Sequence, residues 1–263
     1  MKKFVIFFSI FFSFIVLGIF LRHIFLSNNI PKPNFPLNIE TENFKLYCMP
    51  NDKLAGQKIL DVAEKNFKQL SVDFNHKYSK KINLYVFPDI KDFHQAIGRP
   101  DAADRIINFY NENQHSFFTV SPYNPGSYHS AESIFTLTTH GLTYLFIKDI
   151  YTKKIPNWFI HGIGLWKAKY VGKYGYNKIL NELSQNHQLI PSLKQLEDSD
   201  FSSDIYLSCS YLIIEFINQK WGWYKILALL NDFSSFEKIL EISKEKFREQ
   251  LIDYLDANYS IKK

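Results

Sequence analysis

The sequence contains little cysteine and no concentrated positive charge. Its two cysteines, Cys48 and Cys209, lie far apart and in no spacing typical of metal ligands. We expect two small buried side chains, although the pair could form a disulfide if the domain lies outside the cytoplasm. The net charge is +5, and basic residues adjoin each other only in pairs such as Lys80-Lys81 and Lys153-Lys154. Nucleic-acid-binding surfaces usually need longer basic blocks or stripes, so we expect no nucleic-acid partner.

Internal repeats and low-complexity segments are also absent. Hydrophobic residues make up 46% of the 263 residues and charged residues 22%, the balance of a globular protein. Once the opening stretch is set aside, the remainder fits one sizeable domain, because single domains reach about 250 residues.

One long apolar run is present, at the N-terminus. Residues Phe4 to Leu21 are apolar except for Ser9, Ser13 and Gly18. A helix of about 18 residues is roughly 27 Å long, close to the hydrocarbon thickness of a bilayer. A core helix of this length would normally carry a polar face, and this one has none. We therefore predict that residues 1–26 form a transmembrane anchor.

The residues around this run indicate its orientation. Lys2 and Lys3 precede it, so the N-terminus is expected in the cytoplasm and the main domain outside it. A cleaved signal peptide is the alternative, but it would end in small residues, whereas Leu21 to Leu26 are bulky. We favour an uncleaved single-pass anchor. Residues 27–38, which contain three prolines, are predicted as an extended linker, and residues 39–263 as one domain.

Hydrophobic periodicity predicts an α+β domain with a small mixed sheet and helices first, then a mainly helical half. Strands are expected around Phe44–Leu46 and over Ile82–Phe87, Arg105–Tyr110 and Ser116–Val120. A helix is expected over 51–74, with an apolar stripe of Leu54, Ile59, Ala63, Phe67 and Leu70. A short helix should end near Ile97-Gly98. The later helices are predicted at 131–151, 156–170, 174–184, 206–221, 223–231, 235–242 and 244–259, the last with Ser243 as N-cap.

Two segments of the helical half could carry chemistry. Thr138–Tyr144 reads Thr-Thr-His-Gly-Leu-Thr-Tyr, and Ile155–Trp166 reads Ile-Pro-Asn-Trp-Phe-Ile-His-Gly-Ile-Gly-Leu-Trp. Together they resemble the gluzincin metallopeptidases, in particular the peptidase-MA-like family of zincin domains. That family pairs a helix bearing His-Glu-x-x-His with a later helix reading roughly Pro-x-Trp-Leu-x-Glu-Gly-Leu-Ala-Glu-Tyr. The order of elements over residues 51–259 is also similar, so the resemblance implies a zincin-like fold.

The same resemblance implies which residues would hold zinc. In the family, two histidines at i and i+4 chelate the ion, and a glutamate beside the first activates the bound water. A carboxylate from the later helix is the third protein ligand. This sequence keeps the first histidine as His140, but has Gly141 for the general base, Tyr144 for the second histidine and His161 for the third ligand. The family's later glutamate falls at Leu165.

These departures leave two interpretations of the site. Glycine cannot exchange a proton with water, and acid–base groups contribute about 10²–10⁴ in rate, so ordinary proteolysis is not expected. His140, Tyr144 and His161 could still form a His-Tyr-His site for zinc, although a phenol with a pKa near about 10 is a weak ligand. We favour the other interpretation, in which the histidines are partly buried remnants of an ancestral site.

Several neighbouring side chains are weaker candidates. His115 and His129 could fold back toward His140, but histidines in polar loops are usually solvated. Glu132 could supply a carboxylate, although favourable charge in the first helical turn is its simpler explanation. An aromatic cluster follows the motif and could line a peptide cleft or form core. It consists of Trp158, Trp166, Tyr170, Tyr174 and Tyr176.

The expected function is therefore that of a membrane-anchored, non-catalytic relative of the gluzincins, a pseudopeptidase without a bound cofactor that binds a protein, peptide or cell-envelope component. One alternative is a metal-dependent peptidase or hydrolase with the His-Tyr-His ligand set. Another is a structural envelope protein whose cleft has no function. If the fold is zincin-like, the helices carrying His140 and His161 pack together, with the two side chains within about 10 Å.

Overall fold

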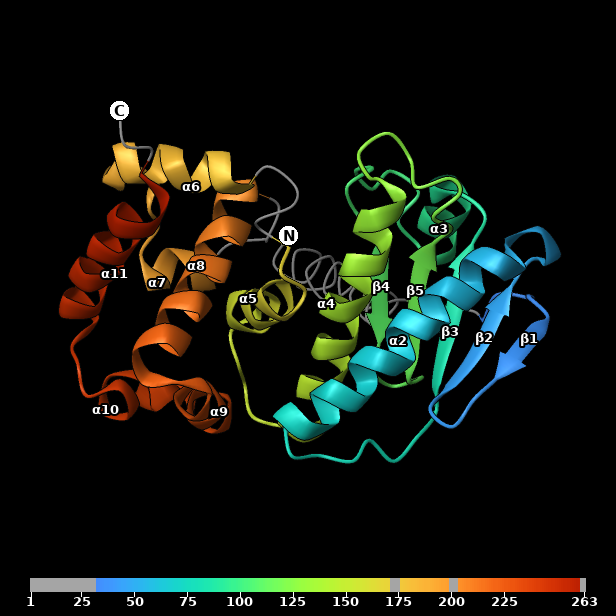
Figure 1. The fold of residues 1–263 in the computed structure, drawn as a ribbon, viewed down its shortest axis with the longest axis horizontal. Coiled ribbons are helices and arrows are strands. Elements are labelled where there is room, and N and C mark those ends of the chain that lie inside the picture. The colour runs from blue at the N-terminus through green and yellow to red at the C-terminus, as the bar shows by residue number, and fades with distance from the viewer. Residues whose placement is uncertain (1–31, 171–175, 199–202, 261–263) are drawn as a thin grey trace, which may run out of the picture.

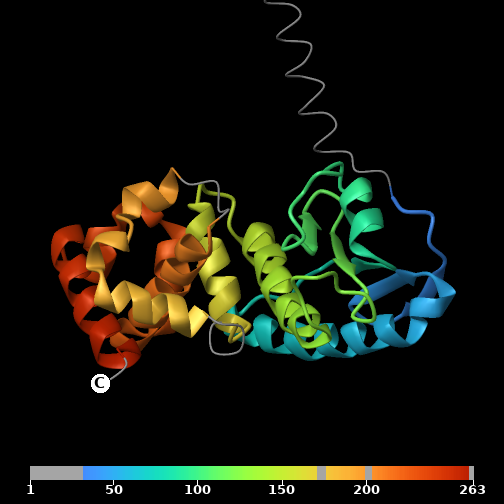
Figure 2. The ribbon, with the colours of Figure 1, turned by 90° about the horizontal axis from the view of Figure 1, so that it is seen from above.

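The structure is a computed structural model, and it describes residues 32–170, 176–198 and 203–260. The predicted membrane anchor, residues 1–26, and the start of the linker lie outside the described residues. Within the described ranges, no helix combines the length and apolar character needed to cross a membrane. The described part is an α+β fold with a five-stranded sheet in its first half and a helical second half, side by side in Figures 1 and 2.

The sheet is mixed, as predicted. Its strands are β1 (Leu37–Glu40), β2 (Phe44–Cys48), β3 (Ile82–Phe87), β4 (Asn108–Asn111) and β5 (Ser116–Val120), in the spatial order β1-β2-β3-β5-β4. The three central strands are parallel, and β1 and β4 are antiparallel edge strands. The β1 strand begins at Leu37, inside the range predicted as linker, where the Asn38 side chain accepts a hydrogen bond from the Cys48 amide.

Two long helices, α2 (Lys53–Asp73) and α4 (Ala131–Ile150), pack against each other and against the sheet (Figure 1). The short α3 (Ile90–Ala96) contacts β3 and β5. The predicted apolar stripe of α2 is confirmed except at Leu54, which is 71% exposed. Ala55 is buried instead, because it lies one turn before Ile59 on the same face of the helix. The Leu54 side chain is turned away from that face by about 100°.

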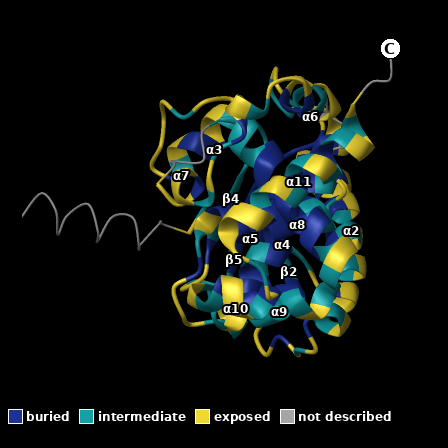
Figure 3. Cartoon of the chain, turned by 90° about the vertical axis from the view of Figure 1, so that its left-hand side faces the viewer, coloured by how far each residue is buried: buried dark blue, intermediate teal, exposed yellow. Residues whose placement is uncertain are grey.

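The second half of the described chain contains the helices α5 to α11. Three short 3₁₀ helices are also present, one in the first half and two in the second. The helices are α5 (Asn157–Lys167), α6 (Tyr176–Gln185), α7 (Leu193–Glu197), α8 (Asp204–Trp221), α9 (Trp223–Asn231), α10 (Phe236–Leu240) and α11 (Lys244–Tyr259), and the 3₁₀ helices are Pro50–Asp52, His187–Leu189 and Phe233–Ser235. The Ser243 side chain caps α11, as predicted. Figure 3 shows buried residues gathered along α4 and α8 and exposed residues on outer helices such as α2.

The α5 helix joins the two halves because it packs against both α4 and α8. It begins directly after Pro156 and carries His161 toward α4. On the side toward α2 and α9, the Lys167 ammonium group lies 3.9 Å from the centroid of the Trp223 ring and 2.5 Å from the Asp73 carboxylate. This ion pair and cation–π contact hold the end of α5 in place.

The two cysteines lie on separate elements, β2 and α8, where both are buried and free. Burial raises the pKa of the Cys48 thiol to about 11 and that of the Cys209 thiol to about 12. Both side chains therefore stay protonated near neutral pH and act as small apolar core residues, as the sequence suggested.

Candidate functional site

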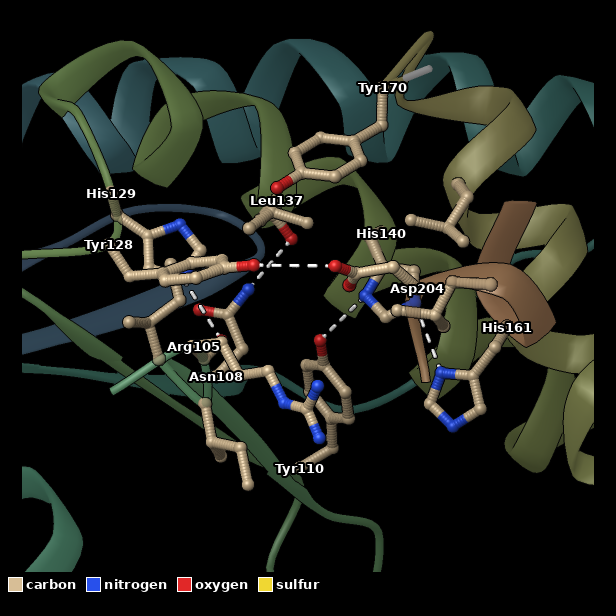
Figure 4. A pocket seen from close by; sticks show the side chains of 14 residues that line it. Arg105, Asn108, Tyr110, Tyr128, His129, Leu137, His140, His161, Tyr170 and Asp204 are labelled. Atoms are coloured by element: carbon tan, nitrogen blue, oxygen red, sulfur yellow. Dashed lines mark hydrogen bonds between the residues drawn. The ribbon is translucent and has the colours of Figure 1, made fainter. Parts of the chain in front are cut away.

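The two motif histidines meet where α4 and α5 pack together (Figure 4). His140 Nε2 and His161 Nδ1 are 3.1 Å apart and hydrogen bonded, and the two rings are stacked with centroids 5.2 Å apart. The prediction that these side chains lie within ligand-sharing distance is confirmed. The remaining nitrogen of His140 is also occupied, because Nδ1 is hydrogen bonded to the Tyr110 hydroxyl at 3.0 Å.

Tyr110 is the residue of this cluster that sequence reasoning missed. It belongs to β4, and its ring stacks on Phe117 and on Tyr144, with centroid distances of 5.4 and 5.0 Å. Asn108, two residues earlier, donates to the Leu137 carbonyl of α4. Alternation along a strand places residues i and i+2 on one face, so the period of two could have indicated that both side chains point toward the motif helix.

Position 141 has no room for the family's general base. A Cβ atom at Gly141 would lie 2.3 Å from Tyr110 Cε1 and 2.8 Å from Phe117 Cε2. Tyr110 cannot easily move away, because its ring is stacked on two neighbours and its hydroxyl is bonded to His140. The tyrosine ring therefore fills the space in which a glutamate side chain would begin.

Tyr144, the third predicted metal ligand, lies close to the pair, with its ring centroid 5.6 Å from that of His161. Burial raises the pKa of its phenol to about 12, so the hydroxyl is neutral near pH 7. In the described part of the chain, no group of three His, Cys, Asp or Glu side chains is placed to hold a metal ion. The cluster therefore offers two neutral histidines and a neutral phenol, without the carboxylate that the zincin motif supplies as a third ligand.

Both histidines are neutral near pH 7. Burial lowers the pKa of His140 to about 3, with a further contribution from His161. Burial also lowers the pKa of His161 to about 4, and the nearby Lys148 ammonium acts in the same direction. Since each neutral ring carries one N–H and one acceptor nitrogen, one histidine donates to the other. Protonation of both rings would place two N–H groups face to face and break this pairing.

We therefore expect the folded protein to lose stability as the pH falls. The unfolded chain takes up protons on these histidines near about pH 6.5, while the folded chain does not until much lower pH, so stability is complete above about pH 7 and declines below about 6.5. Urea unfolding should give a free energy lower by roughly 2–4 kcal/mol at pH 5 than at pH 7. His161→Gln should reduce this pH dependence, whereas His187→Asn, at the surface beside Asp256, should not. An unchanged pH profile in His161→Gln would contradict the assignment.

A cavity of about 190 Å³ lies beside the histidine pair and is lined by residues of β4, α4, α5, α8 and the loops before β4 and α4 (Figure 4). Its apolar wall includes Ile107, Leu137, Leu165 and Leu207. Arg105 and Asp204 also line it. The cavity retains the two features typical of a ligand site, a mainly apolar lining and a few convergent polar groups.

The weaker candidates divide between this cavity and other places. His129 and Tyr170 line the cavity, and His129 is hydrogen bonded to the Arg105 carbonyl at 3.0 Å. His115 lies elsewhere, between Tyr78 and Lys80. Glu132 is in the first turn of α4, where a negative charge is favourable.

The aromatic cluster is likewise divided. Trp158 is completely buried and belongs to the core, and the partly buried Trp166 packs against the core and stacks on Trp223 with centroids 5.8 Å apart. Tyr176 begins α6, and Tyr174 lies outside the described residues. Of this cluster, Tyr170 is the described side chain that reaches the cavity.

No protein-family model matches the chain, and no curated protein matches it in sequence. Its function is therefore inferred from the motif residues and from the arrangement of the site.

Proposed function

We propose that the chain is a zincin-like pseudopeptidase, held at a membrane by its N-terminal apolar segment, that binds a protein, peptide or cell-envelope component. The observation that carries this proposal is the contrast between the two parts of the site. The catalytic position is filled by Tyr110, which also bonds His140, while an open cavity persists beside it.

The arrangement of the motif helices supports a zincin-like fold. The helix with His140 packs beside the helix with His161, and the later helix begins after the Pro156-x-Trp158 pattern. The apolar run from Phe4 to Leu21 supports the membrane anchor, since it is long enough to span the hydrocarbon core. Lys2 and Lys3 favour an extracytoplasmic position for the domain.

The chemistry of the site argues against hydrolysis. A general base must lie within hydrogen-bond reach of the water that it activates, and Gly141 offers none. Asp204 is the carboxylate among the described cavity residues, and its hydrogen bond comes from the Tyr128 hydroxyl at 3.4 Å, not from either histidine. Both histidines are also weak bases, because burial lowers the pKa of His140 to about 3 and that of His161 to about 4, so neither readily takes a proton from water.

Metal content and peptidase activity test the loss of catalysis. The full-length protein, purified in detergent, should contain less than about 0.1 zinc per chain and show no chelator-sensitive cleavage of a broad peptide library. Stoichiometric zinc together with cleavage that is abolished by His140→Ala would overturn the proposal and favour the hydrolase with the His-Tyr-His ligand set.

Binding tests the retained function. Equilibrium dialysis of a mixed N-acetyl-tripeptide library against the full-length protein should enrich a subset of peptides. Leu207→Phe, which fills part of the cavity, should reduce this enrichment. The matched change Leu54→Phe, at an exposed position on α2, should leave it unchanged. Equal enrichment by both variants would place binding outside the cavity.

A further inference from the structure

Of the described arginines, Arg105 is the one that lines the cavity beside the histidine pair. Its side chain is half-buried, and Figure 4 shows it extending among the other labelled side chains. Among the described residues, no carboxylate forms an ion pair with its guanidinium group. A guanidinium group that is partly removed from water gains from an anionic partner, because it loses part of its hydration. The group is therefore available to an anion that enters the cavity.

The charges around Arg105 define which anion it can hold. His140 and His161 are neutral near pH 7, so neither contributes charge to the cavity wall. Asp204 lies on α8 and faces the Tyr128 hydroxyl from the loop before α4, at 3.4 Å. The guanidinium fork matches a carboxylate through two parallel hydrogen bonds. The Asp204 carboxylate also lines the cavity and can accept a hydrogen bond from an N–H group. It therefore suits an amide N–H in another part of the same ligand.

The cavity also sets the size of the apolar part of the ligand. At about 190 Å³ it is slightly larger than a 150 Å³ protein cavity of the kind that holds one benzene molecule. Leu137, Leu165 and Leu207 come from three different helices and form apolar walls of this volume. The space therefore suits one apolar side chain of the size of leucine or phenylalanine.

We propose that the cavity binds the C-terminal residue of a peptide, with the terminal carboxylate on Arg105 and an apolar side chain against Leu137, Leu165 and Leu207. This inference rests on the proposed binding function and adds the group that is recognised. A carboxylate joined to an apolar group could also come from a simple organic acid. The peptide is distinguished by its amide N–H, which Asp204 can accept.

Isothermal titration calorimetry with the full-length protein in detergent tests the inference with three probes. They are N-acetyl-Ala-Ala-Leu with a free carboxylate, the same tripeptide as its C-terminal amide, and 4-methylpentanoate. The free-acid tripeptide should bind best, and the amide should bind roughly 10- to 100-fold more weakly, because it lacks the charge-assisted pair with Arg105. The organic acid should bind more weakly than the tripeptide, because it lacks an N–H for Asp204.

Variants at two arginines give the matched comparison. Arg105→Gln should reduce affinity for the free acid to that of the amide, and Arg105→Lys should recover part of it. Arg99→Gln, at an exposed position outside the cavity, should change nothing. Unfolding temperatures of the three variants show whether each is folded. An Arg105→Gln protein that still binds the free acid with unchanged affinity overturns the inference.

The outcomes separate this inference from the function on which it rests. Equal binding of acid and amide overturns carboxylate recognition and leaves peptide binding intact. Equal binding of the tripeptide acid and 4-methylpentanoate overturns the peptide as the source of the carboxylate. Absence of binding by all three probes overturns the inference, whereas the proposed binding function is overturned only if the tripeptide library also shows no enrichment that depends on the cavity. Metal-dependent cleavage of the tripeptides overturns the pseudopeptidase alone.

Discussion

Gly141→Glu should destabilise the protein by more than about 3 kcal/mol and should not create peptidase activity. The new Cβ would lie 2.3 Å from a ring carbon of Tyr110, closer than non-bonded carbon atoms approach in proteins. Overpacking of this kind typically costs about 1–3 kcal/mol, and a carboxylate buried without a cation adds to that cost. The gain in helix propensity over glycine is only about 1 kcal/mol, too little to offset the clash. Urea unfolding at pH 7.5 measures the difference.

A double-mutant cycle identifies the cause of this destabilisation. Gly141→Ala alone should also destabilise, because its Cβ meets the same ring. In a Tyr110→Ala background the same change should be less costly by at least about 1 kcal/mol, because the closest contact is gone. The restored motif Gly141→Glu, Tyr144→His and His161→Glu should be inactive while Tyr110 is present. Strict additivity of the two alanine changes would show that Tyr110 does not exclude a side chain at position 141.

The sequence predicted most of the regular structure because its long elements carry strong periodicity. The helix predicted over 131–151 is α4 (Ala131–Ile150), and the helices at 223–231 and 244–259 are found as predicted. The edge strand β1 has no such signal, since it is only four residues long and none of them is buried. The five-residue α7 is likewise too short for a periodic pattern to develop.

The site was predictable only in part, for a related reason. The motif resemblance predicted that His140 and His161 lie close together, and the structure places His140 Nε2 3.1 Å from His161 Nδ1. Nothing in the local sequence links Tyr110 to His140, because that contact depends on how β4 docks against α4. Arg105 is separated from Asp204 by about a hundred residues, so their shared cavity follows from tertiary packing alone. Partners contributed by the packing of distant elements are therefore the part of a site that sequence patterns miss.

Two further glycines, both on α5, explain how close the motif helices can come. A Cβ at Gly164 would lie 2.5 Å from His140 Cδ2, so the absence of a side chain there leaves room for the imidazole ring. A Cβ at Gly162 would lie 2.5 Å from the Ser210 carbonyl oxygen and 2.9 Å from its carbon, on α8. The first neighbour is a side chain, but the second is helix backbone, which cannot change rotamer. Any side chain at position 162 must therefore push α5 and α8 apart.

Gly162→Ala should consequently lower the free energy of unfolding by about 2–4 kcal/mol, despite the better helix propensity of alanine. The matched control is Gly56→Ala on α2, whose Cβ would meet only side-chain atoms of Leu46 and Cys48, at 3.1–3.2 Å. Those atoms can shift by a few tenths of an ångström, so this variant should remain within about 1 kcal/mol of the unmodified protein. Urea unfolding of both variants at pH 7.5 makes the comparison, and equal effects would contradict the close helix contact. Because α5 carries His161 and Leu165 while α8 carries Asp204 and Leu207, separation of these helices should also weaken binding in the cavity.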